Sequence, residues 1–384
     1  MSALHQLGHH SQSMVTESTL RQFGGVILSP VNYSPEETIA QCNTFRDHEN
    51  LREIYFDPQL YVPLADRGKL QNWPHLPFDF DTQVSSSISW WESILDRMVA
   101  IAESFAPSAV CSPVAYPRGF DDGYYDMSVQ IGNLLSRRLR GQMRPVLTAL
   151  VGLNDLARTN RHLEVASLLS RFSGDEIYIV LADGTAPRLE RRDSGELEAA
   201  TRLIKLLRNA DFRVTVGHTS SEMVLWKYAG ANNVATGKFF NLRRFTITRF
   251  DDEGASGGRN IPYWFEPSLL AFLREADLRR LRQRFQLSDS HATNEHSATI
   301  LRRLDQPGRP AWLGESWRQF LFWFADCEAR LNSAPSLVRK LLSTAETNWR
   351  RVEELRLRME EPANDGSWIR PWTIAIDELD MRPD

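Results

Sequence analysis

Three aspartates stand where apolar stretches of the chain end, and such positions suit acid–base chemistry. They are Asp57, Asp155 and Asp183. Carboxylates that meet in one cleft can act as general acid, general base or nucleophile once their pKa values are driven apart. They could instead bind a divalent cation through oxygen, or serve as turn, strand-exit and cap residues. We interpret all three as candidate catalytic residues.

The stretch RVTVGHTSSE, residues 213–222, places His218 directly after a short apolar strand. His218 is a candidate base, although a lone histidine is more often a hydrogen-bonded structural residue. The last four residues, 219–222, fit the S/T-x-x-E capping box, in which Thr219 would cap a helix and Glu222 would bond back to the cap. The pattern predicts a structural role for Glu222 and an anion site at the N–H groups of the helix start, beside His218.

Other polar residues follow apolar runs and are predicted to bind substrate: Asn32, Tyr33, Arg118, Lys238 and Arg243. Lys238 and Arg243 would hold an anionic group of the ligand. Lys238 is also a Schiff-base candidate if burial lowers its pKa, whereas the alternative is a solvated loop lysine. The spacing of histidines and cysteines predicts no metal site, and the sequence identifies no cofactor.

Short apolar runs alternate with amphipathic stretches along most of the chain. Nearly continuous apolar runs are typical of strands buried on both faces of a parallel sheet. The runs are 25–31, 54–57, 109–114, 145–151, 176–181, 213–216, 233–236 and, less clearly, 261–265. Helical spacing of apolar residues marks 87–105, 127–142, 162–172, 195–210, 220–230 and 266–285.

This alternation predicts an α/β fold with a parallel sheet, and its extent matches a (β/α)8 TIM-like barrel. A doubly wound open sheet is the alternative, but it usually has a glycine-rich loop after its first strand, where this chain has residues 32–36, NYSPE. A barrel places its active site at the C-terminal ends of its strands. The candidate residues would therefore share one rim, around a pocket for a small-molecule or nucleotide-like ligand.

The sequence predicts four segments. Residues 1–22 would be a flexible tail that carries His5, His9 and His10, residues 23–285 the barrel, 286–311 a polar linker, and 312–384 a helical C-terminal module. Six of the eleven tryptophans lie beyond residue 310. They would form ordinary core packing or a surface for a protein partner, because aromatic residues are enriched at interface centres.

The segment 214–245, VTVGHTSSEMVLWKYAGANNVATGKFFNLRRF, runs from a strand through Gly217 and a helix to a short strand and a second glycine. In this order it resembles the late part of tRNA-guanine transglycosylase-like barrels. The resemblance implies a barrel enzyme that transfers or hydrolyses glycosyl or ribosyl groups. The family's nucleophile and zinc site do not carry over: 230–236 holds no aspartate, zinc-binding cysteines are absent, and 118–126, RGFDDGYYD, is not the family's aspartate-rich motif.

Amino-acid composition and net charge narrow the possible binding partners and the cellular location. The chain has 384 residues and a net charge of −4, so no global basic field attracts it to nucleic acid or anionic lipid. Three scattered cysteines fit the reducing cytoplasm. The first twenty residues lack an apolar signal core, and no apolar stretch is long enough to span a membrane.

Three functions follow as hypotheses. The first is a transferase or hydrolase for a nucleoside-like or phosphorylated substrate. The second is a catalytically inactive barrel that joins a larger assembly through 312–384. The third, which the net charge does not indicate, is nucleic-acid binding through arginine clusters. These clusters are Arg137-Arg138-Arg140, Arg243-Arg244 and Arg279-Arg280-Arg282-Arg284.

Overall fold

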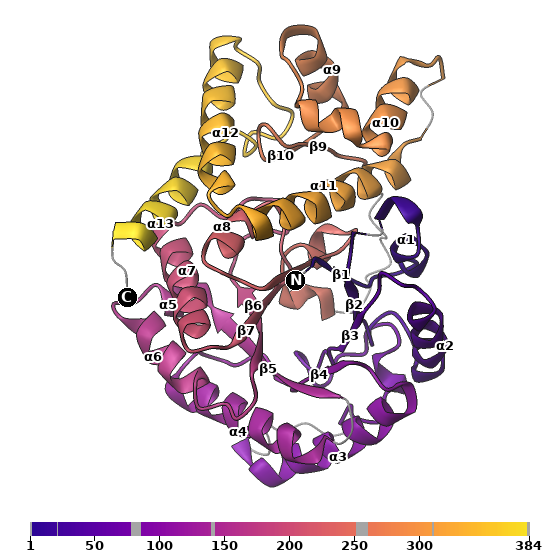
Figure 1. The fold of residues 1–384 in the computed structure, drawn as a ribbon, viewed down its shortest axis with the longest axis vertical. Helices are drawn as coiled ribbons and strands as arrows, with labels where there is room; N and C mark the ends of the chain where they lie inside the picture. Colours follow the sequence, from indigo (N-terminus) through magenta and orange to yellow (C-terminus); the bar gives the residue numbers. More distant parts are fainter. Residues whose placement is uncertain are drawn as a thin grey trace.

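Eight parallel strands close into a barrel in the computed structural model (Figure 1). The structure describes residues 2–20, 22–77, 86–139, 143–250, 260–308 and 311–381. The strands are β1 (Leu4–Gln6), β2 (Gly25–Leu28), β3 (Glu53–Phe56), β4 (Ala109–Cys111), β5 (Arg144–Gly152), β6 (Glu176–Ala182), β7 (Arg213–Gly217) and β8 (Asn233–Thr236). The predicted (β/α)8 TIM barrel is confirmed, and C-terminal helices follow it.

The first strand of the barrel lies inside the segment 1–22, where the sequence predicts a flexible tail. Strand β1 pairs with β2 on one side and with β8 on the other, so it closes the barrel. Its polar residues are buried: His5 packs edge-on against Phe23 at 5.5 Å, and Gln6 Nε2 donates to the Tyr178 hydroxyl at 3.1 Å. The tail prediction is wrong for these three residues because a short strand with two polar side chains has no apolar run.

The eighth predicted strand, 261–265, is not in the barrel. Its C-terminal part forms β9 (Trp264–Glu266), which pairs antiparallel with β10 (Ala271–Leu273) in a separate two-stranded sheet. The predicted helix 266–285 is correspondingly shorter, because α9 spans only Glu275–Arg284. A run of apolar residues indicates burial, and here the burial comes from the C-terminal helices rather than from barrel neighbours.

Helices cover the outside of the barrel (Figure 1). The predicted helices at 87–105, 127–142, 162–172 and 195–210 correspond to α3, α4, α6 and α7, and their buried residues lie on one face, as the apolar spacing requires. The bounds up to β8 are α1 (Gln12–Val15), α2 (Pro35–Arg46), α3 (Ile88–Phe105), α4 (Asp122–Arg138), α5 (Leu153–Leu156), α6 (Arg161–Leu169), α7 (Ser194–Asn209) and α8 (Met223–Tyr228).

A capping box fixes the start of α2. The Ser34 hydroxyl accepts from the Glu37 N–H at 3.3 Å, and Glu37 Oε2 accepts from the Ser34 N–H at 2.7 Å. We expect Ser34→Ala to lower the free energy of unfolding by about 1 kcal/mol, because it leaves helix-end N–H groups without this partner. Urea denaturation measures the change. Ser93→Ala, an exposed substitution within α3, is the matched control and should stay within about 0.5 kcal/mol of the unsubstituted protein.

The predicted linker 286–311 contains regular structure. A short 3-10 turn spans Asp289–Thr293, and α10 spans Glu295–Asp305. Asn294 caps α10 by accepting from the N–H groups of His296 and Ser297, at 3.2 and 3.3 Å. The remaining C-terminal helices are α11 (Leu313–Ser333), α12 (Leu337–Glu354) and α13 (Ile369–Met381).

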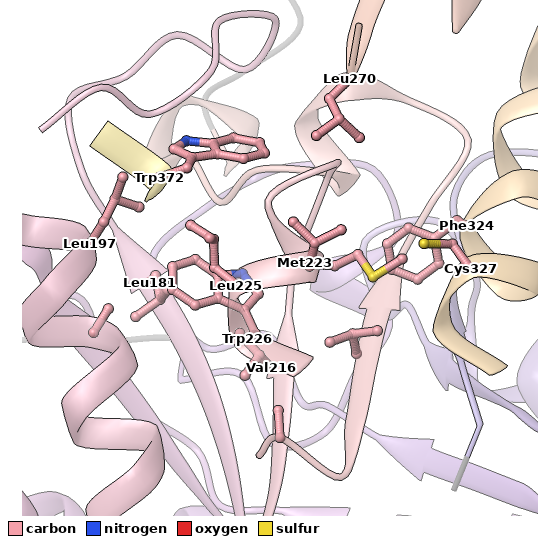
Figure 2. Packing of buried hydrophobic residues seen from close by; sticks show 14 of the residues in the cluster. Leu181, Leu197, Val216, Met223, Leu225, Trp226, Leu270, Phe324, Cys327 and Trp372 are labelled. Atoms are coloured by element: carbon pink, nitrogen blue, oxygen red, sulfur yellow. The ribbon is translucent and has the colours of Figure 1, made fainter. Parts of the chain in front are cut away.

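The barrel and the C-terminal helices share one continuous hydrophobic core. Figure 2 shows Met223 of α8 beside Phe324 and Cys327 of α11, with Trp372 of α13 on the other side of α8. A buried ion pair adds to this contact, because Lys227 Nζ lies 3.0 Å from Glu328 Oε1. Helix α11 is therefore held firmly against the barrel, close to the ends of β8 and β1.

Candidate functional site

A cavity of about 1460 Å³ opens at the C-terminal ends of the strands. Its wall comes from the loops after β1, β2, β3, β6 and β8, and from the first turns of α11. This is the face on which TIM barrels carry their active sites. The lining includes the following charged, polar and aromatic residues: His9, His10, Asn32, Tyr33, Glu37, Arg67, Lys69, Arg188, Lys238, Phe239, Arg243, Arg249, Tyr263 and Trp317.

The cavity is basic. Among the described residues, six lysine or arginine side chains line it, and Glu37 supplies the single carboxylate. Lys69 lies 3.9 Å from Glu37, and Arg188 lies 3.8 Å from Glu361. A concave surface with an excess of one charge sign concentrates its field inside the cleft. The cavity therefore favours an anionic ligand.

Lys238 follows β8 and lines the cavity, as its position in the sequence predicts. Its Nζ donates to the His10 carbonyl at 3.0 Å and lies 4.7 Å from the ring centroids of both Phe239 and Trp317. Burial, with a smaller contribution from the charge of Arg318, lowers the pKa of Lys238 to about 8. The amine is mostly protonated at neutral pH, so it can bind an anion.

Asn32, Tyr33 and Arg243 also line the cavity. Asn32 Nδ2 donates to Ser29 Oγ at 2.7 Å, and the Tyr33 hydroxyl lies 2.8 Å from the Gly8 carbonyl. Arg243 donates to the Gly237 and Lys238 carbonyls, both at 2.9 Å, and its guanidinium lies 3.9 Å from the Phe320 ring centroid. These bonds tie the Arg243 side chain to the loop after β8.

Asp57 is buried and, among the described residues, is not one of those that line this cavity. Its carboxylate accepts from the Gln59 N–H and from the Tyr61 hydroxyl, both at 3.0 Å. Burial raises the pKa of Asp57 to about 6, although the nearby charge of Arg249 opposes the change. A carboxyl with this pKa exchanges its proton near neutral pH, as an acid–base catalyst must.

The structure does not bring Asp155 and Asp183 together with Asp57. Asp155 lies 3.0 Å from both Arg161 and Arg158. Asp183 lies 2.7 Å from Arg191 Nε. Burial alone would raise the pKa of Asp183, but the charges of Arg191 and Arg244 outweigh burial and lower it. Both carboxylates are thus held in ion pairs, and neither lines the cavity.

His218 directly follows β7 and is buried, and its backbone lies in the left-handed region with a φ of 54°. Its N–H donates to Gln6 Oε1 at 2.8 Å, and its ring meets Phe245 edge-on at 5.5 Å. Burial, and then the charge of Arg249, lower the pKa of His218 well below its usual value, so the ring is neutral. Neither ring nitrogen meets a hydrogen-bond partner among the described residues.

The predicted capping box at 219–222 does not form. Helix α8 begins only at Met223, and the Thr219 hydroxyl donates to the Ala235 carbonyl at 2.9 Å. Glu222 instead accepts from Arg191 Nη1 at 2.9 Å and from the Ser220 N–H at 3.1 Å. Glu222 is structural, as the sequence indicates, but through an ion pair. The predicted anion site is wrong because the buried carboxylate of Glu222 occupies this position.

Arg118 is exposed in the loop between β4 and α4 and does not line the cavity. Its predicted role in substrate binding gains no support from this position. Arg118 follows a strand in the sequence, but it lies seven residues beyond the end of β4, in an exposed part of the loop. A strand-end position alone therefore does not place a side chain at the barrel mouth.

No protein-family model and no curated protein matches this chain. The barrel fold is established by the strand pairing alone. The similarity of 214–245 to transglycosylase-like barrels remains a resemblance, which no family or relative identifies.

Several residues of the cavity are not among the sequence predictions. His9 and His10 follow β1, and they are missed because the strand itself is missed. Arg249 lies thirteen residues beyond the end of β8, and Trp317 belongs to a helix outside the barrel. The one available signal is the basic and aromatic composition of 238–249, KFFNLRRFTITR.

Among the described residues, no group of three or more His, Cys, Asp or Glu side chains is placed to hold a metal ion. No helix in the same part of the chain has both the length and the apolar character needed to cross a bilayer. The three cysteines are free and buried.

Proposed function

We propose that this chain is a TIM-barrel enzyme that binds the anionic group of a phosphorylated substrate in the basic cavity. The observation that carries the proposal is the excess of lysine and arginine side chains over carboxylates around a large cleft at the C-terminal ends of the strands. Sites on this face of a barrel commonly hold phosphate groups. Asp57, whose pKa burial raises to about 6, would act as the acid–base group.

The cavity is larger than an inorganic anion requires, and the rings of Trp317 and Phe239 line part of it. Aromatic rings beside cations suit a substrate that combines a phosphate with a flat ring, which a nucleoside-like compound does. The transfer or hydrolysis of a glycosyl or ribosyl group uses a carboxyl that donates a proton to the leaving group together with a second carboxylate, and Asp57 would supply the first of these two groups. These two features support the nucleoside-like and glycosyl-transfer parts of the proposal.

Lys238→Gln should weaken the binding of pyrophosphate about tenfold at neutral pH, because it removes one charge-assisted hydrogen bond to the anion. Isothermal titration calorimetry measures the change. Lys340→Gln removes an exposed lysine from α12, away from the cavity, and is the matched control. Absence of pyrophosphate binding, or equal weakening in both variants, would contradict an anion site at Lys238.

The other two hypotheses gain no comparable observation. Of the six C-terminal tryptophans, all except Trp317 are buried, so they do not form an exposed docking surface. Arginines of α9 are paired with carboxylates: Arg279 with Glu275, and Arg282 with Asp305. Arg243 and Arg244 are buried, and Arg140 lies outside the described residues. Docking through 312–384 and binding of nucleic acid remain predictions from the sequence.

A further inference from the structure

The segment 245–250 separates the basic cavity from Asp57. Phe245 and Phe250 pack on the Tyr61 ring, with centroid distances of 5.0 and 5.5 Å. Tyr61 in turn donates to Asp57 at 3.0 Å. The segment ends in a 3-10 turn, Ile247–Phe250, which carries Arg249 between the two sites.

Arg249 lies at this boundary, in the wall of the cavity and near enough to Asp57 for its charge to act on that carboxyl. Its side chain lines the cavity, although only 7% of the residue is exposed. Nη2 donates to Ser29 Oγ at 3.2 Å, and the guanidinium charge is near enough to Asp57 to oppose the effect of burial on that carboxyl. Nη1 is buried and has no hydrogen-bond partner among the described residues. A guanidinium with an unused N–H donor beside a cavity can turn toward an anion that binds there.

We propose that Arg249 couples the two sites, so that an anion bound in the cavity draws the guanidinium charge away from Asp57 and the Asp57 carboxylate takes up a proton from solvent. This inference rests on the proposed function of the cavity. In the bound state Asp57 would be a neutral carboxylic acid on the far side of segment 245–250. A neutral carboxyl can donate a proton but cannot attack as a nucleophile, so the role left to Asp57 is that of general acid.

Arg249 is the cation that acts on the charge of Asp57. The other titratable groups that face Asp57 are the phenols of Tyr61 and Tyr178 and the thiol of Cys111, and burial raises the pKa of each. These three groups stay protonated and neutral near pH 6. The Asp57 carboxylate and the anion in the cavity therefore compete for the same guanidinium, that of Arg249.

The coupling is reciprocal, because any ligand that favours protonation of Asp57 must itself bind more tightly when Asp57 is protonated. Above about pH 6 the ionised carboxylate shares the charge of Arg249, and anion binding is weaker. Below that pH the carboxyl is neutral, and the anion has the full charge. His9 and His10 line the same cavity, and the imidazole ring is the side chain whose charge ordinarily changes in this pH range, so the test compares variants.

The test measures sulfate binding by calorimetry between about pH 5 and about pH 7.5, a range in which sulfate itself does not titrate. In the unsubstituted protein, the affinity should rise on acidification on the order of tenfold more than in Asp57→Asn. Asp57→Asn should already bind sulfate tightly at the higher pH, because its residue 57 is always neutral. Arg249→Gln should bind weakly and lack the extra rise.

Titrations at about pH 6 in buffers of different ionisation enthalpy add a direct readout. The unsubstituted protein should take up more protons per bound sulfate than Asp57→Asn, up to about one proton. Arg249→Lys keeps the charge but loses the planar fork, so it should retain the pH effect at lower affinity. It also replaces Arg249→Gln if that variant does not fold.

The outcomes separate the two proposals. If sulfate and pyrophosphate do not bind at any pH, the anion cavity itself is wrong. If sulfate binds but Asp57→Asn keeps the same pH dependence and proton uptake, the cavity stands and the coupling through Arg249 is overturned. Loss of the extra rise in Asp57→Asn, together with its retention in Arg249→Lys, is the result that supports the coupling.

Discussion

Replacing Arg191 with methionine should lower the free energy of unfolding by about 3 to 5 kcal/mol at neutral pH. The Arg191 guanidinium lies 2.7 Å from Asp183 and 2.9 Å from Glu222, and all three side chains are buried. Nη2 also donates to the Leu181 carbonyl at 3.1 Å. Methionine fills a similar volume, so little packing is lost. It leaves two buried carboxylates without their closest cation, and the free-energy cost of these unpaired charges accounts for most of the loss of stability.

The cluster around Arg191 already carries more acid than base. Glu190 lies beside Asp183 and Glu222, and Arg244 is the second cation, 3.7 Å from both Glu190 and Glu222. Burial, and then the charge of Glu222, raise the pKa of Glu190 to about 7. Without Arg191, burial would be opposed less strongly and the pKa of Asp183 would rise as well. The variant should therefore regain part of its stability when the pH is lowered to about 5, since the folded state then binds the extra protons.

Urea unfolding followed by tryptophan fluorescence measures both effects. The matched control is Arg192→Met at the next position, because Arg192 is far more exposed and pairs with the exposed Asp365 at 3.3 Å. That variant should lose no more than about 1 kcal/mol. Equal losses in the two variants would show that the buried cluster does not depend on Arg191.

The sequence predicts the fold well where strands are apolar throughout. Strands β5 and β6 are buried along almost their whole length, so their apolar runs stand out. Strand β1 has three residues, two of them polar, and its partner β8 lies more than two hundred residues away. Its place depends on pairing that no local pattern records. The same holds for the hairpin of β9 and β10, whose apolar residues look like one more barrel strand.

The site is predictable only in part, and for a different physical reason. The rule that strand ends share one face places Asn32, Tyr33, Lys238 and Asp57 at or beside the barrel mouth. Whether a strand-end carboxylate is available for catalysis depends on which cation reaches it from another loop. Arg191 pairs with Asp183, whereas Arg249 only approaches Asp57. Each of these arginines comes from another part of the chain. The sequence immediately around each aspartate therefore does not reveal which arginine lies near it.

Asp57→Asn should make the protein more stable at pH 8, by about 3 kcal/mol. The folded-state pKa of Asp57 is about 6, compared with an ordinary value of 3.8, and this difference corresponds to about 3 kcal/mol. Because the pKa is raised in the folded state, the unsubstituted protein loses stability as the pH rises from about 4 to about 6. Asparagine has no charge to bury, so it avoids this loss. The side-chain amide of asparagine can still accept a hydrogen bond from the Gln59 N–H and form one with the Tyr61 hydroxyl.

The gain should vanish near pH 4, where the carboxyl is protonated in the folded protein, and it should reach its full size above about pH 6. Urea unfolding at a series of pH values measures this difference curve. Asp155→Asn is the matched control, because Asp155 is also buried but lies 3.0 Å from both Arg161 and Arg158. That substitution removes favourable charge-assisted bonds and should lower the free energy of unfolding by about 1 to 3 kcal/mol.

Opposite signs for these two substitutions would distinguish a carboxylate that stabilises the fold from one that the fold tolerates at a cost. Evolution retains a destabilising buried charge where activity requires it, and the same substitution should then abolish turnover of the substrate while it stabilises the protein. If Asp57→Asn leaves stability unchanged at pH 8, the carboxylate of Asp57 is not under this electrostatic strain, and its assignment as the acid–base group loses its physical basis.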